Sequence, residues 1–239
     1  MRTYLLEPES RALCREVGLP VTRFSVAVNL REALRSAQEI GYPVVLKVIS
    51  PQVMHKSEVG GVFTNLRGPN EVKKAYREIL ANVTRNRPDA EIVGVQVEEM
   101  APASTEVIIG AVRNPQFGPV IAFGLGGVLV EVLRDVSFRV APIASSDARE
   151  MMAELKGYQI LKGYRGLPRA DLHALEAILL RVSMLVIKHP EICEADLNPV
   201  LVYEKGAKVV DAKIMIEELG PSRRQSRKPE SDGDRQKPL

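Results

Sequence analysis

The stretch GYPVVLKVISPQVMHKSEVGGV, residues 41–62, decides how this chain folds and where its chemistry lies. It begins with a short apolar run, residues 43–49, which predicts a buried strand that carries one lysine, Lys47. Burial of an ammonium group without a partner is costly. Lys47 must therefore pair with an anion, such as a phosphate, or lie on an edge strand from which its side chain reaches water. The run by itself leaves both alternatives open.

The second half of this stretch is a polar loop that ends in two glycines. His55 lies in it beside Lys56 and Ser57, and Gly60 and Gly61 close it. Glycines allow backbone N–H groups to approach an anion closely, and a neutral imidazole is nucleophilic near pH 7. We therefore expect His55 to act as an acid, a base or a phosphoryl acceptor. The alternative for a lone histidine in a loop is a structural role.

On both sides of this stretch, signals for helices and strands alternate. Apolar periodicity, with capping residues Asn29, Ser146 and Asp171, predicts helices over residues 7–17, 30–40, 147–156 and 171–188 and from residue 70 onward. Strands are predicted over residues 22–28, 43–49, 61–66, 91–99, 105–112, 136–142, 198–203 and 208–213. Because hairpin-like strand pairs stand beside helices, we expect an α+β fold of two lobes with largely antiparallel sheets, rather than a doubly wound parallel sheet. The segment MAPAS, residues 100–104, interrupts two strand signals and is the expected boundary.

Acidic residues flank this expected boundary. Glu98 and Glu99 close the preceding strand next to Met100, and Glu106 begins the following one. A carboxylate here could accept a hydrogen bond from a ribose hydroxyl while backbone groups contact a base. The alternative is that these glutamates are simply solvated.

Near the end of the chain, Asn198 in DLNPV and Asp211 in VVDAK each lie beside an apolar strand. Adjacent antiparallel strands would bring their two oxygen donors together, with Asp196 as a third candidate. Mg²⁺ favours one or two such side chains plus substrate phosphates. For Asn198 the alternative is a turn-forming Asn-Pro.

Composition excludes several classes of protein. The chain has 239 residues, 45% apolar and 26% charged, which is typical of a globular protein. Its net charge of +3 is carried by residues 220–239, which hold six basic and three acidic residues. This tail is polar and aperiodic, so we expect it to be disordered. Because the remainder has no basic excess and the chain has no Trp, we expect no nucleic-acid partner.

Other sequence signals are missing. No apolar stretch reaches about 18 residues, and the start, MRTYLLEPESR, lacks the core of a signal peptide. We therefore expect a cytoplasmic protein without a membrane segment. There is no P-loop motif, dinucleotide fingerprint or Cys/His metal cluster. Phosphate would have to be held by Lys47 and glycine loops, and Mg²⁺ by carboxylate and amide oxygens.

Three stretches together resemble a known family: residues 41–62, AVRNPQFGPVIAFGLGGVLVEVLRDVSFRVAPI (residues 111–143), and EADLNPVLV with VVDAKI (residues 194–202 and 209–214). They are similar to the β subunit of ADP-forming acetyl-CoA synthetases (acetate–CoA ligases), an ATP-grasp domain related to the nucleotide-binding part of succinyl-CoA synthetase β. The resemblance covers residues 5–216. It implies an ATP-grasp fold with the nucleotide between two lobes, residues 1–102 and 103–219, followed by the tail.

The resemblance also implies a role for each site residue. Lys47 matches the lysine that contacts nucleotide phosphates, and His55 matches the histidine that carries a transient phosphoryl group. The other matches are Gly60 and Gly61 at the nucleotide, Glu98 and Met100 in the adenine hinge, Glu106 at the ribose, Gly126 and Gly127 (with Gly124) in a glycine loop, and Asn198 and Asp211 as Mg²⁺ ligands. Arg139 could hold phosphate but matches no motif role.

The implied reaction is acyl-CoA + ADP + phosphate ⇌ acid + CoA + ATP through a phosphohistidine, with ATP or ADP and Mg²⁺ bound. The family carries its CoA-binding part on an α subunit or in the same chain; here we expect a separate α subunit, in a hetero-oligomer such as α2β2. Two alternatives are another ATP-grasp ligase that acts through an acyl phosphate and a nucleotide-sensing module without turnover. The acyl acid and the choice between adenine and guanine are not determined by the sequence.

Overall fold

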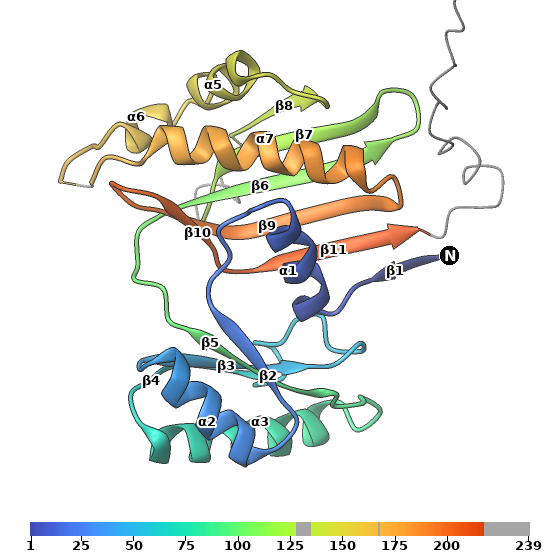
Figure 1. The fold of residues 1–239 in the computed structure, drawn as a ribbon, viewed down its shortest axis with the longest axis vertical. Coiled ribbons are helices and arrows are strands. Elements are labelled where there is room, and N and C mark those ends of the chain that lie inside the picture. The colour runs from blue at the N-terminus through green and yellow to red at the C-terminus, as the bar shows by residue number, and fades with distance from the viewer. Residues whose placement is uncertain (128–134, 167, 218–239) are drawn as a thin grey trace, which may run out of the picture.

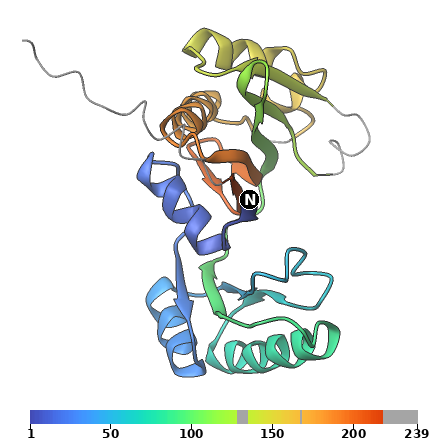
Figure 2. The same ribbon diagram turned by 90° about the vertical axis from the view of Figure 1, so that its right-hand side faces the viewer.

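The computed structural model describes residues 1–127, 135–166 and 168–217. Within them the chain forms two lobes, one above the other in Figures 1 and 2. Each lobe has its own sheet and its own hydrophobic core. Every ladder between named strands in these residues is antiparallel. The expected α+β architecture is therefore confirmed.

The smaller lobe is a four-stranded sheet, in the order β2-β5-β3-β4, with two helices on one face (Figure 1). Its elements are β2 (Phe24–Ala27), α2 (Leu30–Ile40), β3 (Val44–Ile49), β4 (Val62–Leu66), α3 (Pro69–Asn86) and β5 (Gly94–Glu99). All six residues of β3 are buried, because the strand is paired on both edges. Side chains alternate along a strand, so Leu46 and Val48 enter the core of this lobe and Lys47 points to its other face.

The larger lobe is a seven-stranded sheet in the described residues, in the order β1-β11-β9-β6-β7-β8, with β10 paired to β9. Its strands are β1 (Arg2–Tyr4), β6 (Thr105–Asn114), β7 (Gly118–Leu125), β8 (Val136–Val140), β9 (Ile192–Val202), β10 (Ala207–Val209) and β11 (Ala212–Glu217). Its helices are α1 (Glu7–Glu16), α5 (Ser145–Ala153), α6 (Tyr158–Leu161) and α7 (Leu172–Lys188).

The core of the larger lobe lies between the sheet and α7. This helix runs along one face of the sheet and buries Leu175, Leu179 and Val182 against it (Figure 1). On β6, Val107 and Ile109 face this core while Val112 is exposed. No helix among the described residues combines the length and the apolar character needed to cross a membrane.

The first residues of the chain belong to the larger lobe rather than to the smaller one. β1 pairs with β11, and Cys14 and Leu19 lie in the larger core. Figure 2 shows α1 between the two lobes. The chain then enters the smaller lobe at β2 and returns to the larger one through residues 100–104. The prediction that one lobe extends over residues 1–102 is therefore wrong at its N-terminal end. The predicted tail, residues 220–239, lies outside the described residues.

Most predicted elements are present, and the differences have local reasons. Asn29 and Asp171 cap α2 and α7 by accepting hydrogen bonds from the N–H groups of Glu32 and Ala174. Ser146, by contrast, is not a cap: α5 begins at Ser145, and the Asp147 carboxylate accepts the N–H of Ala144 at 2.7 Å.

The strands near the end of the chain also differ. β9 begins at Ile192 rather than at residue 198, and the strand predicted over residues 208–213 is divided into β10 and β11. The acidic residues Glu194 and Asp196 alternate with buried ones on β9, so the first half of the strand has no continuous apolar run in the sequence. β1 and α6 were not predicted, because three and four residues are too few to show a period.

The packing of α7 gives a direct test of the larger core. Leu179 is fully buried, whereas Met184 on the same helix is 57% exposed. We expect Leu179→Ala to lower the free energy of unfolding by about 2–5 kcal/mol, because it leaves a cavity under the helix. Met184→Ala should change it by less than about 0.5 kcal/mol. Urea unfolding followed by circular dichroism measures both; equal effects would contradict the described packing.

Candidate functional site

A buried carboxylate, that of Glu7 at the start of α1, lies at the centre of the contact between the lobes. Its Oε1 lies 3.0 Å from Lys47 Nζ and accepts a hydrogen bond from Gln96 Nε2 at 2.8 Å. Its Oε2 lies 2.8 Å from Lys56 Nζ. One turn further along α1, Arg11 Nε lies 3.2 Å from Glu7 Oε1. Because α1 packs on the larger lobe and both lysines belong to the smaller one, these ion pairs join the lobes.

A second buried carboxylate, Glu98 on β5, completes the cluster. Arg11 Nη2 lies 2.6 Å from Glu98 Oε1, and Lys47 Nζ lies 3.0 Å from Glu98 Oε2. The Thr22 hydroxyl donates to Glu98 Oε1 and accepts from Arg11 Nη1 at 2.9 Å. The carbonyl of Val210, from the larger lobe, accepts from both Arg11 and Lys47. The charged groups therefore have opposite partners, as burial requires.

The electrostatics keep the central pair ionised. Burial alone would raise the pKa of Glu7, but its three cationic neighbours outweigh burial and lower this pKa to about 2. Burial alone would lower the pKa of Lys47, but the carboxylates of Glu7, Glu98 and Asp211 reverse the effect and raise it. Both side chains therefore carry their charges at neutral pH.

A pocket of about 250 Å³ opens beside this cluster, and both lobes line it. The smaller lobe contributes Lys47 from β3 and residues 54–58 from the loop that follows, including His55. The larger lobe contributes Asp211 and Lys213. The His55 side chain is exposed. The stretch that carries Lys47 and His55 thus brings both residues to one pocket, with a carboxylate from the other lobe.

Asn198 lies on β9, and Asp211 immediately precedes the neighbouring strand β11. The ladder between β9 and β11 pairs Leu197 with Ala212, so the next positions, Asn198 and Asp211, lie opposite each other. Asn198 is exposed, and Asp211 lines the pocket. Burial, and then the negative charge of Glu7, raises the pKa of Asp211. The register agrees with the predicted juxtaposition of the two oxygen donors.

This donor set fits a divalent cation whose coordination is completed by phosphate oxygens. Asn198 and Asp211 offer an amide and a carboxylate oxygen, which Mg²⁺ accepts together with substrate phosphates. Within the part of the chain that the structure describes, no group of three or more His, Cys, Asp and Glu side chains could hold a metal. A cation bound here would therefore need oxygen ligands from the substrate or from water.

Gly60 and Gly61 have a different role from the expected phosphate cradle. Their N–H groups donate within the loop, to the carbonyls of Ser57 at 3.1 Å and Lys56 at 2.7 Å, and are not directed at an anion. Gly60 has a φ of +67°, a conformation that glycine adopts without strain. A Cβ on Gly61 would lie 2.6 Å from Val48 Cγ1. The two glycines therefore close the loop tightly against β3.

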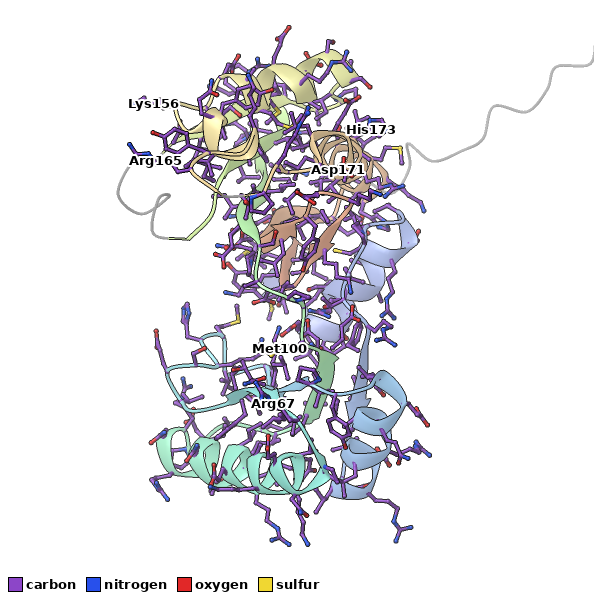
Figure 3. All side chains as sticks on the ribbon, turned by 90° about the vertical axis from the view of Figure 1, so that its left-hand side faces the viewer. Arg67, Met100, Lys156, Arg165, Asp171 and His173 are labelled. Atoms are coloured by element: carbon purple, nitrogen blue, oxygen red, sulfur yellow. The ribbon has the colours of Figure 1, made fainter. Side chains whose placement is uncertain are left out.

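Glu98 and Met100, the expected adenine hinge, have separate environments. Glu98 is 1% exposed and both of its oxygens are occupied by the ionic cluster, so its side chain does not face the pocket. Met100 is 37% exposed and lies at the junction of the two lobes (Figure 3). Its N–H donates to the Pro43 carbonyl at 3.2 Å. The side chain of Glu98 is therefore a partner of Lys47 rather than a base-contacting group.

Glu106, Gly126 and Gly127 come together at the start of β6. The Gly126 N–H donates to the Glu106 carbonyl at 2.8 Å, and a Cβ on Gly126 would lie 2.9 Å from Glu106 Cβ. Gly127 has a φ of +66°, and a Cβ there would lie 3.3 Å from Glu106 Oε2. The Glu106 side chain is exposed. Residues 128–134, which follow these glycines, lie outside the described residues.

Arg139 is engaged away from the pocket. Its guanidinium lies 3.3 Å from Glu150 Oε2 and also pairs with Glu154, both on or next to α5. These two glutamates raise the pKa of Arg139, first through the hydrogen bonds that Arg139 donates to Glu154. This arrangement gives Arg139 a role in attaching α5 to β8.

Sequence analysis missed the anion that holds Lys47. Glu7 and Arg11 lie four residues apart on a helix, a spacing typical of a solvated surface pair. The requirement that Lys47 find a partner predicted an anion such as a phosphate, and nothing local to Glu7 marked its carboxylate as that partner.

Together, the two-lobed antiparallel fold and the pocket lined by lysine, histidine and carboxylate side chains define a domain that handles phosphate groups between its lobes. The ATP-grasp domain family matches residues 1–216. The chain belongs to the ATP-grasp family.

Curated relatives resemble this chain over nearly its whole length. It is 47% identical over 212 residues to the β subunit of acetate–CoA ligase (ADP-forming) I of Pyrococcus furiosus, which covers 89% of this chain and 91% of that subunit. It is 53% identical over 201 residues to acetate–CoA ligase (ADP-forming) I of Archaeoglobus fulgidus, covering 84% of this chain and 29% of that longer protein. The same kind of domain thus occurs as a separate subunit and within a longer chain.

Solved structures of acetyl-CoA synthetases are also similar to this chain. The dinucleotide-forming acetyl-CoA synthetase 1 of Ca. Korarchaeum cryptofilum, in complex with coenzyme A and Ca-AMPCP, matches with a TM-score of 0.88 at 52% identity, covering 90% of this chain and 94% of that chain. Another structure of that enzyme, with Mg-AMPPCP, has its phosphohistidine segment pointing towards the nucleotide binding site. A third has a phosphorylated segment in what is termed the site I orientation.

The ionic cluster makes a prediction about acid stability. Because the pKa of Glu7 is lowered from 4.5 to about 2, its ionised form contributes stability that is complete above about pH 4.5 and is lost as the pH falls towards 2. The shift corresponds to roughly 3 kcal/mol. We expect Glu7→Gln to be less stable than wild type by about this amount near pH 7, with the difference shrinking towards pH 3.

Urea unfolding of both proteins across this range measures the difference. Glu39→Gln, which changes a carboxylate with 69% side-chain exposure on α2, is the matched control and should follow wild type within about 0.5 kcal/mol. A constant gap between wild type and Glu7→Gln at every pH would contradict the described ion pairs.

Proposed function

We propose that this chain is the nucleotide-binding, phosphoryl-transferring β subunit of an ADP-forming acyl-CoA synthetase, which interconverts acyl-CoA, ADP and phosphate with the free acid, CoA and ATP. The observation that carries the proposal is the pocket in which Lys47, His55 and Asp211 meet from two lobes. It occurs in a chain that is about half identical to such a β subunit over nine-tenths of its length. The acyl acid stays open.

In the proposed reaction His55 is the phosphoryl acceptor. An unprotonated imidazole nitrogen attacks the γ-phosphorus of ATP, so that a P–N bond forms while the bond from the γ-phosphorus to the bridging oxygen breaks and ADP leaves. Lys47 neutralises charge on the phosphates, since phosphoryl transfer depends mainly on alignment and charge stabilisation. For this, the Lys47 ammonium would share its positive charge between Glu7, Glu98 and the incoming phosphate.

Asn198 and Asp211 are proposed to hold Mg²⁺. When bound, the cation supplies positive charge that neutralises the phosphate oxygens. The contribution of this chain is to hold an amide oxygen on β9 and a carboxylate oxygen next to the start of β11, so that the donors are positioned before the nucleotide binds.

The remaining contacts are proposed for the nucleoside. The junction at Met100 would contact the base through backbone groups, and the exposed Glu106 carboxylate would accept a hydrogen bond from a ribose hydroxyl. Gly126 and Gly127 bring the backbone close to Glu106 and would leave room beside it for the nucleotide. Gly60 and Gly61 act indirectly, by shaping the loop that carries His55.

The partner follows from the same proposal. The curated relatives include a protein named as a β subunit and a longer single chain. We propose that a CoA-binding α subunit completes the enzyme, in an assembly such as α2β2, and that it works in the cytoplasm. His55 would then relay the phosphoryl group between the nucleotide and that subunit.

The relay predicts a covalent intermediate. Incubated with γ-labelled ATP and Mg²⁺, with and without the α subunit, the chain should acquire acid-labile phosphate that maps to His55 by mass spectrometry and that ADP removes. His55→Ala should abolish the label while nucleotide affinity stays within about threefold of wild type. The matched control is His173→Ala, which replaces an exposed histidine on α7 (Figure 3) and should leave labelling unchanged.

Two results would contradict the relay. Bound ATP without any label on His55, even with an active α subunit present, would favour a ligase that forms an acyl phosphate directly or a nucleotide sensor. Equal loss of ATP binding and labelling in His55→Ala would make His55 a binding residue only.

The metal ligands can be tested separately. Asp211→Asn retains the shape of the side chain but removes the charge that favours Mg²⁺. We expect the Mg²⁺ concentration needed for half-maximal labelling to rise about tenfold or more, with little change in the binding of nucleotide without metal. Calorimetric titration and labelling against Mg²⁺ concentration measure this; an unchanged Mg²⁺ requirement would remove Asp211 from the ligand set.

A further inference from the structure

The segment that carries His55 is held at both ends and almost unattached between them. At one end Val53 is buried in the smaller core, and at the other Val59 packs against it. Asn82 and Asn86 on α3 donate to the carbonyls of Gly60 and Val59, which fixes the second end. Between these ends lie residues 54–58, of which His55, Ser57 and Glu58 are exposed.

Residues 54–58 have one strong contact outside their own loop. Within the part of the chain that the structure describes, the ion pair of Lys56 Nζ with Glu7 Oε2 at 2.8 Å is the only hydrogen bond or ion pair that joins them to a residue outside 50–61. The other hydrogen bonds of the segment, such as that from the Glu58 N–H to the His55 carbonyl, are internal. Among the described hydrogen bonds and ion pairs, the Lys56 side chain is therefore what ties the segment of His55 to the larger lobe.

Glu7 is suited to be a fixed acceptor for this lysine. Its side chain is 4% exposed, and its Oε1 is held independently of Lys56 by Lys47, Gln96 and Arg11. Departure of Lys56 would leave Glu7 still paired. It would also move into water the ammonium of a side chain that is already 15% exposed. The contact can therefore break without leaving a buried charge unpaired, which is the costly outcome in most buried ion pairs.

We propose that Lys56 is a positioning residue: its ion pair with Glu7 docks the segment of residues 54–58 so that His55 faces the nucleotide pocket, and the pair must break whenever the segment leaves. This rests on the proposed function of His55 as the phosphoryl acceptor. The related enzyme of Ca. Korarchaeum cryptofilum has its phosphohistidine segment in more than one orientation, which is the kind of movement such a contact would control.

The proposal distinguishes Lys56 from a phosphate-binding lysine. Both kinds of residue would matter for labelling of His55, but only a phosphate ligand would matter equally for nucleotide affinity. Lys56→Met removes the charge and keeps most of the stem, whereas Lys56→Arg keeps the charge and can still reach Glu7. Lys74→Met is the matched control, because Lys74 is 78% exposed in its side chain and lies on α3.

The experiment measures three quantities on each variant of the full chain: the Kd for Mg-ATP, the single-turnover rate of phosphate transfer to His55, and hydrogen exchange of the amides in residues 54–58. For Lys56→Met we expect a Kd within about threefold of wild type, a transfer rate at least about tenfold lower and faster exchange confined to this segment. Lys56→Arg should recover most of the rate. Lys74→Met should match wild type in all three.

Several outcomes would overturn the proposal. A Kd that rises as much as the transfer rate falls would make Lys56 a phosphate ligand. Unchanged exchange in residues 54–58 would show that the ion pair does not hold the segment. If wild type itself takes no phosphate on His55, the proposed function fails, but the exchange measurement still tests the docking contact separately. Glu7→Gln provides a second variant, in which exchange of the same segment should rise.

Discussion

The two lobes meet at the carboxylate of Glu7, and the rest of the site depends on this contact. Three carboxylates, those of Glu7, Glu98 and Asp211, and three cations, Arg11, Lys47 and Lys56, lie together with little exposure to water. Such a cluster is tolerable only when each buried charge has an opposite partner in good geometry. The consequence is that the lobes are aligned by electrostatic pairing rather than by a shared hydrophobic core.

This alignment sets the geometry of the pocket. Lys47 lies on a buried strand that is paired on both edges, and Asp211 lies at the start of β11, a strand inside the larger sheet. His55 is attached differently, on a loop whose ionic contact with the other lobe, among the described residues, is the pair of Lys56 with Glu7. The proposed relay through His55 would use both kinds of support, since nucleotide binding favours fixed groups and phosphoryl relay favours a movable one.

The structure also shows that residues next to a predicted functional position can have a supporting role in the site. Gly60 and Gly61 follow the histidine loop in the sequence, but their N–H groups are used within the loop. Glu98 lies next to the junction between the lobes, yet its side chain faces inward to Lys47 and Arg11. In both cases the described hydrogen bonds and ion pairs of the residue support a neighbouring group of the site. Residue type and order in the chain identify such positions without telling whether they support the site or contact a ligand.

The sequence by itself determined the α+β class, the buried strand with Lys47, the amphipathic face of α3 and the caps Asn29 and Asp171, because each depends on periodicity or hydrogen bonding within a few residues. It also predicted that Asn198 and Asp211 would lie close together, since each lies on or next to one of two neighbouring antiparallel strands. Only the tertiary structure decided that β1 and α1 join the larger lobe and that Glu7 is the anion for Lys47. Those residues are 40 positions apart, and their pairing depends on the path of the chain between the lobes, which no local pattern records.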